Sequence, residues 1–104
     1  MLPSTDPFEA LGDPNRREIL HLLSRHDLAV QQIADALPIS RPAVSRHLRL
    51  LKGAGMVAER ADGTRRIYHL ERQGVEAVRD YLEAVWGEAA VRFRLVAENT
   101  RPQP

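Results

Sequence analysis

The segment PISRPAVSRHLRLLKGAG, residues 38–55, has four basic side chains and no acidic one between two signals that end helices. Pro38 ends any helix that precedes it, and the glycines of the GAG triplet end the next one. Ser40 is a suitable N-cap, so the sequence predicts a helix from Ser40 to Lys52. Its inward face is predicted to consist of Val44, Leu48 and Leu51.

The outer faces of this helix are suited to DNA. A short helix is predicted over residues 30–37, and only a few residues separate the two helices, so they must cross steeply, as in a helix-turn-helix. A basic amphipathic helix by itself more often only faces solvent, so the neighbouring elements decide in favour of DNA. An α-helix fits the major groove, and Arg pairs with guanine through two hydrogen bonds. The side chains suited to base edges and phosphates are Ser40, Arg41, Ser45 and Arg46.

Two helices and a β-hairpin are predicted around this segment. The helices span residues 6–11 and 13 to about 25, the second with Asp13 as N-cap and proline in its first position. The β-type stretches at residues 56–60 and 65–70 flank the turn signal ADGT. The fold class is therefore predicted to be mainly α with a small β-hairpin that carries basic residues.

A long amphipathic helix is predicted from Glu71 to about Ala97, where apolar residues recur at steps of three and four. This stripe is long for so small a chain, because three short helices offer too little surface to cover it. One interpretation is that the apolar stripe packs only against the core of its own chain. We favour a dimer interface, since a two-fold dimer spaces two recognition helices by one DNA turn, about 34 Å. The interface residues predicted on this helix are Leu82, Val85, Trp86, Ala89 and Phe93.

Length and composition are those of one globular domain. Of the 104 residues, 43% are hydrophobic and 28% are charged. No apolar run approaches the roughly 18 residues that would span a bilayer. The domain is predicted over residues 1–97, with a frayed polar tail over residues 98–104. The first residues carry acids and no secretory-signal pattern, so we expect a cytoplasmic protein that has no membrane partner.

Several kinds of chemistry are excluded by what the sequence lacks. It has no cysteine, which excludes disulfides, thiolate metal sites and a cysteine nucleophile. It has no G-x-S-x-G, no H-E-x-x-H and no phosphate-binding glycine loop, and its neighbouring carboxylates are more simply a solvated helix face. We therefore expect no enzyme activity and no cofactor.

Positive charge is concentrated in one third of the chain. Residues 36–66 hold seven arginines and lysines against two acids, a net charge of +5, whereas the remainder holds eight against twelve, a net charge of −4. A basic surface on an acidic body is typical of a protein that binds a polyanion. Double-stranded DNA is the predicted partner.

Three segments resemble the ArsR/SmtB family of winged helix-turn-helix transcriptional repressors. They are LGDPNRREILHLL at residues 11–23, LAVQQIADALPISRPAVSRHLRLLKGAGMV at residues 28–57, and RADGTRRIYHL at residues 60–70. The resemblance covers roughly residues 6–95. Each segment alone is only suggestive, but their combination is specific.

The resemblance implies a winged helix-turn-helix, with elements in the order α-α-α-α-β-β-α, that forms a homodimer through its first and last helices. Phe8 and Leu11 of the first helix would then join the interface. Arg49 would contact the flank of the site, and Arg49 and Lys52 would both contact phosphates. The hairpin would be the wing, and its contacts would come from Thr64, Arg65 and Arg66.

The chain departs from the metal sensors of that family. Some of those proteins have metal-binding cysteines in the third helix, where residues 28–32 of this chain are LAVQQ. Others bind metal through carboxylate and histidine side chains on the last helix. No metal site is predicted, because the last helix has no histidine and its scattered acids alone do not suit zinc. The four histidines are expected to be surface or partly buried, with His47 near DNA. The acids in question are Glu76, Asp80, Glu83 and Glu88.

The predicted function is sequence-specific regulation of transcription by a dimeric repressor that occupies an inverted-repeat operator. Two alternatives stay open. A regulator of the same fold would respond to a small-molecule effector bound between the last helices, and a winged helix would alternatively dock another protein. The uniformly basic face argues against protein docking, because interface cores are depleted of charge.

Overall fold

The fold is built on the apolar face of α4 (Arg41–Gly53). The computed structural model describes residues 5–100, and for residues 90, 95 and 98–100 it describes the backbone only. α4 begins at Ser40, whose Oγ accepts a hydrogen bond from the Ala43 backbone N–H at 3.3 Å. Val44, Leu48 and Leu51 are all buried, which confirms the predicted inward face. At roughly 1.5–3 kcal/mol for each large buried aliphatic side chain, this face anchors α4 in the core.

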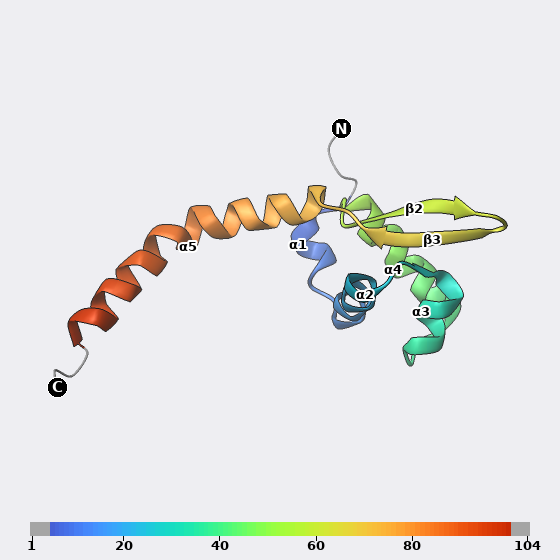
Figure 1. Ribbon diagram of the computed structural model, residues 1–104, viewed down its shortest axis with the longest axis horizontal. Coiled ribbons are helices and arrows are strands. Elements are labelled where there is room, and N and C mark those ends of the chain that lie inside the picture. Colours follow the sequence, from blue (N-terminus) through green and yellow to red (C-terminus); the bar gives the residue numbers. More distant parts are fainter. Residues whose placement is uncertain (1–4, 101–104) are drawn as a thin grey trace.

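Helices α1 (Pro7–Ala10), α2 (Pro14–Arg25) and α3 (Val30–Ala36) surround α4 (Figure 1). The carboxylates of Asp6 and Asp13 cap the first two, and Asp13 Oδ1 accepts from the N–H of Asn15 at 2.8 Å. α2 and α3 complete the core with three large aliphatic side chains. These are Ile19, Leu23 and Ile33.

The sheet has three strands, where the sequence predicted two. β2 (Val57–Asp62) and β3 (Arg65–Leu70) form the expected antiparallel hairpin, but β2 runs two residues past the predicted end. The turn therefore consists of Gly63 and Thr64 alone. The strand that was missed is β1 (Leu28–Ala29), which pairs with β3 in the order β1-β3-β2. Two residues are too few to show the alternation that identifies a strand in a sequence.

α4 ends in a Schellman motif. The N–H of Gly55 donates to the Lys52 carbonyl and that of Met56 to the Leu51 carbonyl, both at 3.0 Å. Gly55 has a φ of 72°, the left-handed conformation that glycine adopts at little cost. α5 (Gln73–Thr100) starts against this turn, because the N–H of Gly74 donates to the Gly55 carbonyl at 2.8 Å. A Cβ on Gly74 would collide with the turn, so a glycine permits this close approach.

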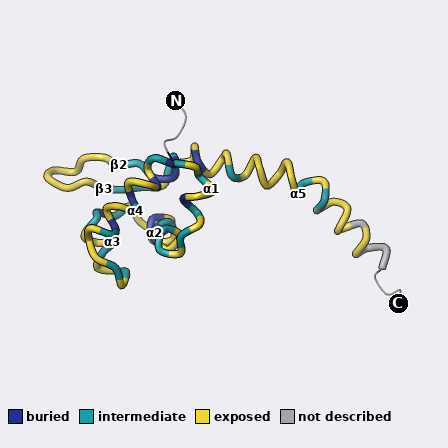
Figure 2. The backbone as a smooth tube through the Cα atoms, turned by 180° about the vertical axis from the view of Figure 1, so that it is seen from behind, coloured by how far each residue is buried: buried dark blue, intermediate teal, exposed yellow. Residues whose placement is uncertain are grey.

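Beyond its first turns, α5 leaves the body of the protein and projects away from the hairpin (Figure 1). At 1.5 Å per residue, its 28 residues extend about 42 Å. The radius of gyration is 18.2 Å, against about 13 Å for a compact chain of this length. Buried residues gather around α1, α2, α4 and the start of α5, whereas most of α5 and the hairpin tip are exposed (Figure 2). No helix within residues 5–100 is long and apolar enough to cross a membrane.

α5 continues through Thr100, three residues past the predicted domain end at Ala97. The predicted frayed tail covered residues 98–104. Its first three residues are therefore helical, and residues 101–104 lie outside the part that the structure describes.

Because the Schellman motif requires a positive φ at residue 55, substitution of Gly55 is expected to destabilise the fold. Gly55→Ala is expected to lower the free energy of unfolding by about 1–2 kcal/mol, because a Cβ disfavours left-handed backbone. Urea denaturation followed by circular dichroism measures this loss. Gly87→Ala is the matched control, since Gly87 is helical and its new Cβ would meet only the flexible Glu83 side chain. That control is expected to be neutral or to stabilise by up to about 1 kcal/mol, and equal losses in both variants would contradict the assignment.

Candidate nucleic-acid interface

The solvent-facing sides of α4 carry basic and hydroxyl side chains, because its apolar face is occupied by the core. Arg41, Arg46 and Arg49 are exposed, and none of them makes a side-chain hydrogen bond or ion pair with another residue in the described part of the chain. Ser45 is likewise exposed. Three guanidinium groups are thus available to an external acceptor.

The other basic residues of this surface are held by acceptors within the chain. Lys52 Nζ lies 3.2 Å and Arg66 NH1 lies 3.4 Å from the same oxygen, Glu59 Oε1. Arg65 NH2 donates to Gln32 Oε1 at 3.0 Å. Residues that the sequence grouped together as DNA contacts therefore fall into two sets, one free and one restrained.

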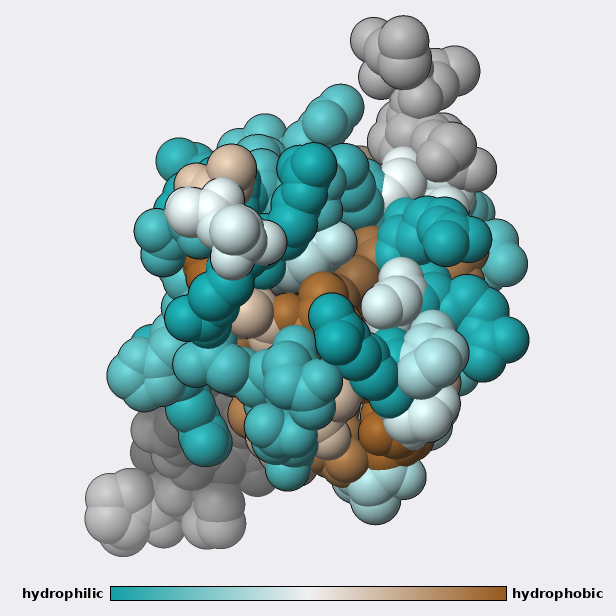
Figure 3. All heavy atoms as spheres, turned by 90° about the vertical axis from the view of Figure 1, so that its right-hand side faces the viewer, coloured by the Kyte–Doolittle hydropathy of each residue, from teal (hydrophilic) through white to brown (hydrophobic). Residues whose placement is uncertain are grey.

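A cleft of about 340 Å³ lies between the hairpin and the first turns of α3 and α4. It brings together three of the predicted contact arginines, which the chain separates by as many as 25 positions. Seen from the hairpin end, hydrophilic side chains cover most of the surface around a narrow hydrophobic band (Figure 3). The polar side chains that line the cleft are Gln31, Arg41, Glu59, Thr64, Arg65, Arg66 and Tyr68.

Glu59 and Tyr68 are polar groups of this surface that the sequence did not single out. They lie opposite each other in the β2–β3 register, and the Tyr68 hydroxyl donates to the Glu59 carboxylate. Burial, and then this hydrogen bond, raise the pKa of Tyr68 to about 12. Hydrogen bonds from Tyr68 and Lys52 lower the pKa of Glu59, so the carboxylate is charged at neutral pH. A glutamate within a predicted basic hairpin was the signal available in the sequence.

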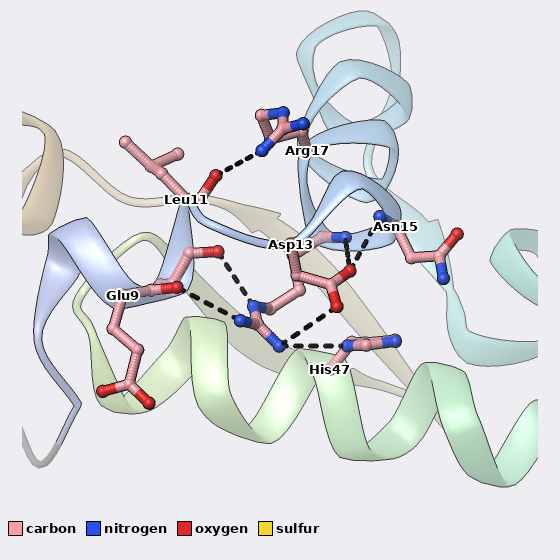
Figure 4. Close-up of polar contacts among 8 residues, drawn as sticks. Glu9, Leu11, Asp13, Asn15, Arg17 and His47 are labelled. Atoms are coloured by element: carbon pink, nitrogen blue, oxygen red, sulfur yellow. Dashed lines mark hydrogen bonds and ion pairs between the residues drawn. The ribbon is translucent and has the colours of Figure 1, made fainter.

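The side chain of Arg16, on α2, contacts residues of α1 and α4. Figure 4 shows its partners Glu9, Asp13 and His47. Its Nε donates to the Ala10 carbonyl at 2.8 Å and its NH2 to the Glu9 carbonyl at 3.1 Å. Its NH1 lies 3.4 Å from Nδ1 of His47 on α4 and 4.0 Å from the carboxylate of Asp13. Because a guanidinium only donates, Nδ1 of His47 is the accepting side of this contact. The Arg16 side chain is only 12% exposed, and its contacts with Ala10 and His47 are part-buried, whereas the one with Glu9 is exposed.

Asp13 combines this contact with its role as N-cap of α2. Burial raises the pKa of Asp13, but hydrogen bonds from the backbone N–H groups of Arg16 and Asn15 outweigh it and leave the pKa below its usual value. A charged carboxylate therefore stands at the positive end of the helix dipole.

The acids of α5 and the histidines do not converge. Within the described residues, no three histidine, aspartate or glutamate side chains lie close enough to hold a metal ion.

The apolar stripe of α5 is largely uncovered. Val78 packs against the core, but further along the helix Trp86 is 51% exposed and Phe93 is 68% exposed. From α1, Phe8 reaches the start of this stripe, with its ring 5.0 Å from that of Tyr81 in an edge-to-face contact. Of the other predicted interface residues, Leu82 and Val85 are exposed, whereas Leu11 and Ala89 are partly buried.

The chain is similar to known bacterial transcriptional regulators in sequence and in structure. Residues 13–59 match bacterial regulatory proteins of the arsR family. The HTH-type transcriptional regulator Rv2034 of Mycobacterium tuberculosis is 46% identical over 86 residues, which cover 83% of this chain and 80% of that protein. The transcriptional repressor SdpR of Bacillus subtilis is 41% identical over 56 residues, 54% of this chain and 62% of that protein. An ArsR-like transcriptional regulator from Rhodococcus sp. RHA1 has a similar structure, with a TM-score of 0.71 and 31% identity over 90% of this chain and 89% of that one.

Arg16→Ala is expected to lower the free energy of unfolding by about 2–3 kcal/mol, since it leaves the part-buried Ala10 carbonyl without its charged donor and removes the part-buried contact with His47. Thermal and urea denaturation measure the loss. Arg17→Ala is the matched control, because Arg17 makes one exposed hydrogen bond, to the Leu11 carbonyl at 2.7 Å. That variant is expected to lose less than about 1 kcal/mol. Losses of the same size in both variants would show that Arg16 does not join the helices.

Proposed function

The chain belongs to the arsR family of bacterial regulatory proteins and is a DNA-binding transcriptional regulator, and on that premise we propose that it is a dimeric repressor. It would act in the cytoplasm by occupying an inverted-repeat operator. In the proposed complex α4 enters the major groove, and the β2–β3 hairpin follows the adjacent backbone or minor groove.

The observation that carries this proposal is the set of unpaired arginines on α4. Arg46 and Ser45 would read base edges from the middle of the helix, and Arg41 would do so from its first turn. Ser40 uses its oxygen as the helix cap, which leaves its O–H to donate to a phosphate. Arg49 would reach a phosphate at the flank of the site.

The restrained side chains supply the remaining proposed contacts. Lys52, at the end of α4, and the hairpin residues Thr64, Arg65 and Arg66 would bind the phosphate backbone. Such contacts carry little sequence information but much of the affinity, and they make it steeply dependent on salt.

The proposed dimer forms through α5 and α1. An isolated helix that projects from the body with an uncovered apolar stripe needs a partner surface, and a second copy offers the same stripe. Phe8 would extend the stripe of Leu82, Val85, Trp86 and Phe93, with Ala89 at its centre. Leu11 would join from the edge, because it is partly buried against the core.

Regulation by a small molecule bound between the last helices is the second candidate function. A thiolate metal sensor is not proposed, because the sequence has no cysteine. No catalytic role is proposed either.

Arg46→Ala tests the reading of bases. Binding to DNA from upstream of the protein's own gene is expected to weaken by about 1–3 kcal/mol, with a much smaller loss on a shuffled duplex. Fluorescence anisotropy titrations at two salt concentrations measure both. Arg25→Ala, at the end of α2, serves as the control for loss of one positive charge elsewhere. A loss of equal size on both duplexes would remove Arg46 from the base-reading residues.

Phe93→Asp tests the dimer. Sedimentation equilibrium at micromolar concentration is expected to show a wild-type dimer and a variant that dissociates at least about tenfold more readily, because a carboxylate is costly in an apolar contact. Val91→Asp is the matched control, since Val91 is 55% exposed but points to the opposite side of α5. A wild-type monomer, or equal effects of the two substitutions, would contradict the proposed interface.

A further inference from the structure

Glu59 is the acid placed among the cations that are proposed to bind phosphates. Residues 36–66 contain only two acids, Glu59 and Asp62, against seven basic residues. For Asp62 the structure shows no ion pair within the described residues, whereas Glu59 pairs with two cations through one oxygen. The two cations come from different elements, Lys52 from α4 and Arg66 from β3.

The Glu59 side chain is less exposed than its two cationic partners and also contacts Tyr68. The side chain is 20% exposed, while Lys52 and Arg66 are 53% and 67% exposed. The hydroxyl of Tyr68, on the neighbouring strand, donates to the carboxylate. The anion is therefore held at the edge of the cleft, and the cations reach toward it from the solvent side.

We propose that Glu59 is an intramolecular competitor of DNA: its carboxylate occupies Lys52 and Arg66 in the free protein and must be exchanged for phosphates when DNA binds. The inference rests on the proposed function, since it concerns the same DNA-binding surface. It assigns a role in setting DNA affinity to a residue that is not itself a DNA contact.

The chemistry of the exchange is balanced. A carboxylate and a phosphate accept the same charge-assisted hydrogen bonds from ammonium and guanidinium groups. Both ion pairs are solvent-exposed and hence weak, so DNA can displace the carboxylate, but each exchange reduces the gain from the new contact. Arg41, Arg46 and Arg49 have no such competitor within residues 5–100 and would bind DNA without this loss.

Glu59→Gln removes the charge and keeps the shape of the side chain. Affinity for a random duplex is expected to rise about three- to fivefold at low salt, as for the loss of one exposed ion-pair partner. The slope of the logarithm of the binding constant against the logarithm of the salt concentration should become steeper by up to about 0.9 for each additional phosphate that the protein contacts. Glu76→Gln makes the same chemical change on α5, where Glu76 pairs only with Arg72, and is expected to leave binding unchanged.

The decisive measurement is the coupling between Glu59 and Lys52. Lys52→Gln is expected to weaken random-duplex binding less than twofold in the wild-type background but about three- to fivefold in the Glu59→Gln background, where Lys52 is free. Anisotropy titrations of the wild type, the two single variants and the double variant complete this double-mutant cycle. Circular dichroism melting of each variant verifies that it is folded.

Each outcome decides the inference. A larger Lys52 effect after Glu59→Gln supports competition. Equal Lys52 effects in the two backgrounds overturn it and leave Glu59 as a general repulsive charge. Weaker binding by Glu59→Gln overturns it too, because the carboxylate would then position the cations for DNA.

A second comparison applies if Glu59→Gln does not fold. In the otherwise unchanged protein, Lys52→Gln should cost less affinity than Arg49→Gln, since Arg49 has no acceptor within the described chain. Equal costs would overturn the inference. A wild-type protein that binds no DNA would contradict the proposed function itself, which distinguishes that failure from the failure of the competition alone.

Discussion

The burial of one face of α4 is the constraint on which the DNA-facing surface depends. Val44, Leu48 and Leu51 fix the rotation of the helix about its own axis, because each lies in the core. With that rotation fixed, Arg46 and Arg49 can only point to solvent. Arg16 supports this arrangement from the other side, since its guanidinium joins the α1 carbonyls to His47 of α4. The direction of the arginines is thus a consequence of packing rather than of their own interactions.

Around this helix, the positive charge of the surface is partly neutralised within the chain. Glu59, Gln32 and Asp27 accept from Lys52 and three hairpin arginines, whereas the arginines of α4 have no side-chain partner among the residues that the structure describes. Free and restrained cations have different affinities for an external phosphate, because the restrained ones must first leave an acceptor. A count of basic residues therefore overstates the charge that is available to DNA.

The proposed dimer surface is the stripe on α5, which is physically separate from α4 and the hairpin. α5 is fastened at its start by the Gly55 turn and by Val78, and then extends beyond the body. The edge-to-face contact of Phe8 with Tyr81 joins α1 to that helix, and Arg16 joins the end of α1 to α4. A continuous series of contacts therefore connects the uncovered stripe with the helix that is proposed to read DNA.

The helices and their order, the inward face of α4, the hairpin and the amphipathic character of α5 could all be predicted from the sequence. These follow from local signals, namely proline and glycine stops, aspartate and serine caps, and apolar periods of three and four, all of which act over a few residues. The sequence also identified the candidate contact residues, since a basic helix beside a basic hairpin is visible in the order of the side chains. Strand β1 was not determined in this way, because its two residues are a strand only through pairing with β3. Which cations are free depends on the packing of the elements, since Lys52 and Glu59, or Arg65 and Gln32, become neighbours only when segments separate in the chain come together.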